Sequence, residues 1–163
     1  MGVIRYEKIT NDWLSDLLYA KGINCTVRDF SVEKVGTGQL GETRRFHISY
    51  IDAKANAPKT LIGKFPSDDS VAAETGRTMG FYKAEVMFYQ KLSKNAKISV
   101  PELYYAELDE ENNFVLILED MSPAKQGDHM LGCSVELAQI GLTELAKLNG
   151  KFWNDKDLEK EKW

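Results

Sequence analysis

The sequence has little of what would point to secretion, a membrane or nucleic acid. Its two cysteines, Cys25 and Cys133, lie far apart and fit no metal or redox spacing, which is typical of a reducing compartment. No apolar run reaches membrane-spanning length, and the first residues contain no signal-peptide core. The 21 basic residues are scattered among 25 acidic ones, for a net charge of −4. We therefore expect a cytoplasmic protein that binds neither nucleic acid nor a membrane.

What is present predicts an α+β fold. The 163 residues are 43% hydrophobic, enough for one domain-sized core. Thr10 is expected to cap a leading helix that Gly22 ends. A further helix is expected at about 77–92, after a polar loop that follows Pro66. Its apolar face would carry Phe81, Tyr82, Glu85, Phe88, Tyr89 and Leu92. Strand-like alternation predicts five strands, at 27–35, 44–50, 60–65, 103–108 and 114–118.

The C-terminal third reads differently. Residues 119–133 break the sheet pattern and predict a hinge or linker. Ser134 is then expected to cap a helix that continues to about Trp153, followed by a charged tail.

A glycine-rich stretch, Gly36-Thr37-Gly38-Gln39-Leu40-Gly41, has the spacing G-x-G-x-x-G. In a dinucleotide-binding fold such a loop must open a helix, but here it runs into residues with strand alternation. A glycine loop between two antiparallel strands is what protein kinases place over the phosphates of ATP. An ordinary tight hairpin without a ligand is the alternative for these residues alone.

Two charged residues stand out within apolar patterns. Lys64 lies in a strand whose other residues are expected to be buried on both faces of the sheet. Glu85 lies within the apolar stripe of the helix at 77–92. A buried charge needs a partner of opposite sign, so we expect the two side chains to pair. Kinases use such a pair to hold the α- and β-phosphates. A solvent-reaching lysine and a glutamate at the edge of the stripe is the other interpretation.

Five motifs follow one another with sensible spacing. Together they resemble the aminoglycoside phosphotransferase and choline kinase superfamily, nearest to its ecdysteroid kinase-like branch, over nearly the whole chain. The motifs are Gly36 to Thr43, Lys64-Phe65-Pro66, Glu85 to Tyr89, Val100-Pro101 and Leu116 to Met121.

The resemblance covers only the N-terminal lobe of that superfamily. It implies a protein-kinase-like N-lobe at 1–118, built on a five-stranded antiparallel sheet with one inserted helix. It further implies a hinge or linker at 119–133 and, at 134–163, the first helix of an absent C-lobe with the charged tail.

ATP is the cofactor that the resemblance implies, and the hinge around 118–121 would bind its adenine. Gly63 departs from the family pattern, since many relatives have an apolar residue before the lysine. The residues that would bind the nucleotide are Gly36, Gly38, Gln39, Gly41, Lys64, Glu85, Glu119 and Met121.

Catalytic groups are not found. Phosphoryl transfer in this superfamily requires a catalytic Asp, an Asn on the metal and a further Asp on Mg²⁺. Neither His47 nor His129 is followed by such a set. The pair Glu119-Asp120 lies at the adenine end of such a site, so we interpret it as part of the hinge rather than as a metal ligand. We expect no catalytic residue and no metal ligand here, and an isolated chain that is inactive.

Two functions remain open at this point. The first is the ATP-binding lobe of an enzyme that transfers the γ-phosphate of ATP to a hydroxyl of a small molecule, with the acceptor unspecified among aminoglycosides, choline-like alcohols and steroids. The alternative is a truncated, non-catalytic module that self-associates or binds a partner through the helix at 134–153, whose apolar face lacks a neighbour. A dinucleotide-dependent oxidoreductase rests on the glycine spacing alone.

Overall fold

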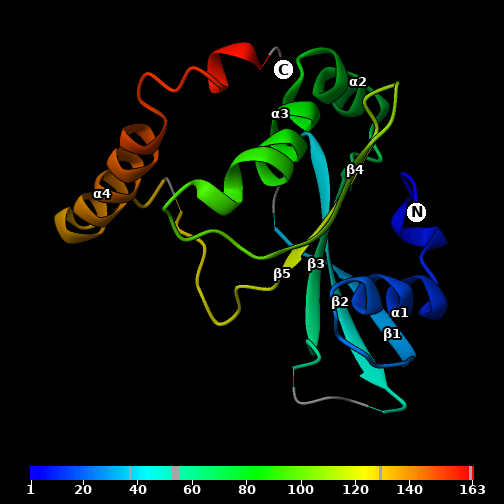
Figure 1. The fold of residues 1–163 in the computed structure, drawn as a ribbon. Helices are drawn as coiled ribbons and strands as arrows, with labels where there is room; N and C mark the ends of the chain where they lie inside the picture. The colour runs from blue at the N-terminus through cyan, green and yellow to red at the C-terminus, as the bar shows by residue number, and fades with distance from the viewer. Residues whose placement is uncertain (37, 53–55, 129, 162) are drawn as a thin grey trace.

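The computed structural model describes residues 1–36, 38–52, 56–128, 130–161 and 163. Its centre is one antiparallel sheet with strand order β1-β2-β3-β5-β4 (Figure 1). The predicted α+β class and five-stranded antiparallel sheet are therefore confirmed. The strands are β1 (Val27–Lys34), β2 (Gly41–Tyr50), β3 (Thr60–Pro66), β4 (Leu103–Leu108) and β5 (Phe114–Glu119).

Strand β3 lies in the middle of the sheet and is paired on both sides. Thr43 of β2 lies opposite Lys64, and Leu116 of β5 lies opposite it on the other side. The glycine-rich stretch connects β1 to β2, and just before it the backbone N–H of Val35 donates to the carbonyl of Thr43 at 2.9 Å. The order of strand, glycine loop and strand is as predicted.

The two faces of the sheet have separate cores, because successive side chains of a strand point to opposite faces. Helix α1 (Asn11–Ala20) covers the face that Leu61 and Phe65 share. Helix α3 (Phe81–Met87) covers the other face, on which Ile62 lies. The second cluster consists of Tyr82, Val86, Tyr89, Phe114, Leu116 and Leu118.

Helix α1 has the ends that the sequence predicts. The side chain of Thr10 accepts a hydrogen bond from the N–H of Trp13 at 3.1 Å. Past the helix, Gly22 has a φ of +77°, the left-handed conformation that glycine adopts readily.

The segment between β3 and β4 corrects the sequence prediction. The expected polar loop contains helix α2 (Ser70–Thr78), whose first turn is capped by the side chain of Asp69, which accepts from the N–H of Ala72 at 2.8 Å. The next helix, α3, begins only after Gly80, because Gly80 has a φ of +72° and interrupts the helical path. A π-helical turn, η2 (Phe88–Leu92), continues α3. The sheet therefore carries two inserted helices.

Helix α4 (Val135–Phe152) begins as predicted, with the side chain of Ser134 accepting from the N–H of Leu137 at 3.3 Å. None of its residues is buried. The contacts that join it and the tail to the rest of the chain include a hydrogen bond from the N–H of Ser99 to Glu144 at 3.2 Å. Within the described ranges, no helix combines the length and the apolar content that crossing a bilayer demands.

Candidate functional site

Lys64 and Glu85 form the ion pair that the sequence predicts. The ammonium group comes from β3 and the carboxylate from α3, so the pair joins the sheet to the helix. Their side chains are 31% and 32% exposed. The expectation that Lys64 is surrounded by buried residues on both faces is therefore wrong. Tyr82 and Val86 occupy the buried positions of α3, which leaves Glu85 at the edge of the apolar stripe. The pair is thus half-buried and can reach a ligand at its open side.

The glycine loop needs its glycines for backbone reasons. Gly36 has a φ of +75°, which strains any residue with a side chain. A Cβ at Gly38 would lie 2.8 Å from the carbonyl oxygen of Gly41, and a Cβ at Gly41 would lie 3.1 Å from that of Phe65. Gln39 is exposed, and Thr37 lies outside the described residues. The hairpin itself imposes these requirements, with or without a ligand.

A cleft of about 570 Å³ lies between the glycine loop, β3 and the segment after β5. This volume is in the range of small-molecule sites, which run from about 300 to 1,000 Å³. We call it the hinge cleft. Its lining residues are Val35, Gly36, Gly38, Thr43, Arg45, Ile62, Pro101, Leu118, Glu119, Asp120, Met121, Ser122, Ala124, Lys125 and Gln126.

The predicted site residues divide into two groups around this cleft. Gly36, Gly38, Glu119 and Met121 line it, whereas Gln39, Gly41, Lys64 and Glu85 do not. Lys64 nevertheless stands beside its wall. Thr43, directly opposite Lys64 in the sheet, lines the cleft, and so does Ile62, which shares the face of Lys64 two residues earlier.

Several residues that line the hinge cleft were not predicted as site residues from the sequence. Val35 and Ile62 were assigned only to strands, and no role was given to Thr43 or Lys125. Alternation within the strands does carry a signal for Ile62, since it places Ile62 on the face of Lys64. The loop residue Lys125 has no comparable signal.

Asp120 is held by the chain itself. The guanidinium Nε of Arg45 lies 2.7 Å from one carboxylate oxygen, and the N–H of Ser122 donates to the other at 3.0 Å. Burial opposes ionisation, but the hydrogen bond from Arg45 and that from the Ser122 N–H outweigh it and place the pKa of Asp120 below its usual value. Its neighbour Glu119 accepts from the N–H of Glu102 at 3.0 Å.

No cluster of protein ligands for the Mg²⁺ that the resemblance implies is present among the described residues. Among them no group of three histidine, cysteine, aspartate or glutamate side chains is placed to hold a metal ion. Of the two carboxylates that line the hinge cleft, Asp120 already accepts from Arg45 and Ser122, and Glu119 accepts from the N–H of Glu102. His129 lies outside the part of the chain that the structure describes.

Gly63 has a structural reason in this chain. A Cβ there would lie 2.7 Å from ring atoms of both Phe46 and Phe65. It would point into the core beneath α1, on the opposite face from the hinge cleft. A glycine at position 63 is therefore explained by aromatic packing on the far face.

Comparisons with known proteins give a distant structural likeness. No protein-family model matches the chain, and no curated protein matches it. Two similar solved structures are GDP complexes of aminoglycoside 2'-phosphotransferase-IIIa, one wild-type and one a point mutant. The wild-type complex has a TM-score of 0.46 at 14% identity, with 92% of this chain and 44% of that chain covered. The mutant has a TM-score of 0.47 at 14% identity, with 91% and 43% covered.

The chain thus spans less than half the length of these two structures. At 14% identity and a TM-score below 0.5, the likeness does not assign the chain to a family.

Proposed function

We propose that this chain is the nucleotide-binding lobe of an ATP-dependent phosphotransferase that acts on a hydroxyl of a small molecule. The observation that carries the proposal is the Lys64–Glu85 ion pair beside a cleft that the glycine loop and the hinge border. A helix glutamate that holds a strand lysine is the arrangement by which kinases fix the cation for the α- and β-phosphates.

The lining of the hinge cleft supports a nucleotide as its occupant. Val35, Ile62, Leu118 and Met121 give it apolar surface against which the flat base of a nucleotide can pack. Gly36 and Gly38 border it without side chains, so backbone groups can come close to an anion there. Ile62, in this apolar lining, and Lys64 share one face of β3 two residues apart.

The proposal includes the family and the division of the chain. We infer membership of the aminoglycoside phosphotransferase and choline kinase superfamily, nearest to the ecdysteroid kinase-like branch, from the five motifs. Residues 1–118 would be the N-lobe, 119–133 the hinge, and 134–163 a helix and tail that belong with a C-lobe. Because the described residues include no cluster of three metal-binding side chains, we assign them nucleotide binding alone and leave phosphoryl transfer to other groups.

The test is nucleotide binding by calorimetry with ATP, ADP and GDP. We expect Lys64→Ala to weaken binding by about tenfold to a hundredfold, the usual effect of losing a hydrogen bond to a charged group. Lys83→Ala is the matched control, because Lys83 lies on α3 two residues before Glu85 and outside the hinge cleft. A wild-type chain that binds none of these nucleotides, or a Lys64→Ala variant that binds as tightly, would sink the proposal.

A second candidate function rests on α4. Leu137, Ile140 and Leu145 are each at least half exposed, which is unusual for large apolar residues of one helix. We propose self-association through this helix as the alternative. Sedimentation that shows a monomer at all concentrations tested, unchanged in Ile140→Glu, argues against it.

The oxidoreductase interpretation has no such support. It requires a helix directly after the glycine loop. The loop instead runs into strand β2, which begins at Gly41.

A further inference from the structure

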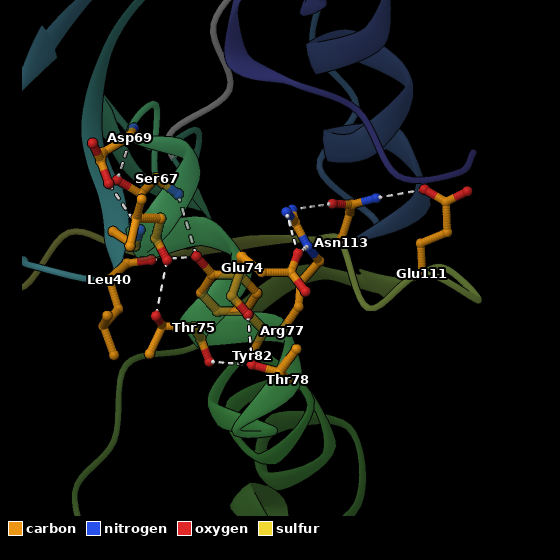
Figure 2. A network of polar contacts seen from close by, with 12 residues as sticks. Leu40, Ser67, Asp69, Glu74, Thr75, Arg77, Thr78, Tyr82, Glu111 and Asn113 are labelled. Atoms are coloured by element: carbon orange, nitrogen blue, oxygen red, sulfur yellow. Dashed lines mark hydrogen bonds and ion pairs between the residues drawn. The ribbon is translucent and has the colours of Figure 1, made fainter.

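The hydroxyl of Tyr82 joins three segments of the chain. Tyr82 lies on α3, three residues before Glu85, and its O–H donates to the carbonyl oxygen of Leu40 in the glycine loop. The same oxygen accepts from the N–H of Ser67, at 3.3 Å, in the connection between β3 and α2 (Figure 2). One side chain therefore links the glycine loop and this connection to α3.

The ring of Tyr82 is fixed by its surroundings. Its residue is 3% exposed, and its ring lies 4.6 Å from that of Phe114, at 34° between planes. A Cβ at Gly76 of α2 would lie 2.3 Å from an atom of the same ring. Helix α2 thus leaves room for the ring only because residue 76 has no side chain.

Helix α2, which provides this space, is capped at its start and joined to the β4–β5 hairpin near its end. At its start Asp69 accepts from the N–H of Ala72, as described above. Near its end, Arg77 donates to Glu74 of its own helix and to Asn113 of the β4–β5 hairpin, both at 3.0 Å (Figure 2). Tyr82 is therefore packed against an element that is tied to the sheet.

We propose that Tyr82 is a positioning residue that holds the glycine loop in register with the helix that carries Glu85. Residues three apart share one face of a helix, so α3 presents Tyr82 to the loop and Glu85 to Lys64. The inference rests on the proposed function, because the glycine loop covers phosphates only if the hinge cleft binds a nucleotide.

The hydrogen bond to Leu40 also orients the peptide group that joins Leu40 to Gly41. In a trans peptide the C=O and N–H point in opposite directions. Because the Leu40 carbonyl is turned to Tyr82, the N–H of Gly41 points away from it. The hydrogen bond from Tyr82 to Leu40, which we call the Tyr82 tether, therefore fixes the direction of the Gly41 N–H in the loop proposed to cover the phosphates.

The first experiment compares Tyr82→Phe with wild type by amide hydrogen exchange without nucleotide. The variant keeps the ring and removes only the hydroxyl, and thermal unfolding checks that it folds. We expect exchange at Ser67 and across 38–43 to rise about fivefold, the effect of losing one ordinary hydrogen bond. Tyr89→Phe is the matched control: Tyr89 is a buried tyrosine in η2, which continues α3, and its hydroxyl makes no hydrogen bond to a described residue. Unchanged exchange of the loop in Tyr82→Phe would overturn the tether.

The second experiment measures ADP affinity of the same variants. We expect Tyr82→Phe to bind ADP about fivefold more weakly and Tyr89→Phe to bind as wild type does. If wild type binds no nucleotide, the proposed function fails, while the exchange experiment still decides the tether. If wild type binds ADP and Tyr82→Phe binds it equally well, the positioning role is wrong even where the proposed function stands.

Discussion

The sheet and helix α4 have comparable apolar patterns and opposite degrees of burial. In β5, all five residues from Phe114 to Leu118 are buried, since helices cover both faces of the sheet. In α4, Leu137, Ile140 and Leu145 recur at helical spacing, yet none of the 18 residues is buried. An apolar periodicity shows which face of an element would bury surface, but only a packed neighbour turns that face into stability.

The largest expected effect lies in the sheet. Phe46 is fully buried and packs against Phe30 and Phe65. We expect Phe46→Ala to lower the free energy of unfolding by about 3–5 kcal/mol, because the cavity adds to the lost transfer energy. Urea denaturation followed by circular dichroism measures this. A loss below about 1 kcal/mol would show that the sheet core is no better packed than α4.

An intermediate effect is expected at Asp120, where the chain leaves the sheet towards α4. Its pKa is lowered in the folded state, so the stability it contributes is present at neutral pH and is lost as pH falls below about 4, the usual pKa of aspartate. We expect Asp120→Asn to cost about 1.5–3 kcal/mol at pH 7, the usual range for hydrogen bonds to charged groups.

The pH series supplies the check on this assignment. The difference in unfolding free energy between wild type and Asp120→Asn, measured from pH 7 to pH 3, should shrink as pH falls below about 4. Asp157→Asn is the control, because the Asp157 side chain is 91% exposed on the tail and should change stability by less than about 0.5 kcal/mol. A difference that stays constant down to pH 3 would mean that the carboxylate charge of Asp120 is not what stabilises the fold.

The smallest effect is expected in α4, and its sign is informative. Ile140 is 61% exposed, so Ile140→Ala removes little burial and replaces isoleucine with the best helix former. We expect a change between zero and about 0.4 kcal/mol of stabilisation. Denaturation at two protein concentrations provides the measurement. A concentration-dependent destabilisation would mean that the apolar face of α4 is covered in solution, and the contrast with the sheet would disappear.

Much of the sheet could be predicted from sequence, because two-residue periodicity and turn residues mark strands locally. The Lys64–Glu85 pair was predictable for a related reason: each charge interrupts an apolar pattern, and a charge in such a place requires a partner. Helix α2 was missed because its buried residues are Ala73 and Gly76, which add almost nothing to an apolar stripe. The helix-capping Asp69 was the one local signal for it.

The hinge cleft and the Tyr82 tether were beyond local patterns. Tyr82 was assigned to an apolar stripe, and its ring is indeed buried, but nothing local shows where its hydroxyl goes. Its acceptor, Leu40, is 42 residues away. Phe81, assigned to the same stripe, is 50% exposed because α3 starts only after Gly80 and turns Tyr82 rather than Phe81 to the sheet.

The position of Lys64 in a strand paired on both sides has a mechanical consequence. Lys64 lies on the central strand β3, which is released only when the whole sheet opens, since central strands are among the last parts of a fold to open. Glu85 lies on α3, which packs on the sheet through side chains and has no backbone pairing with its strands. Any adjustment of the ion pair is therefore a movement of α3. Because Tyr82 lies on the same helix, the glycine loop would move with it.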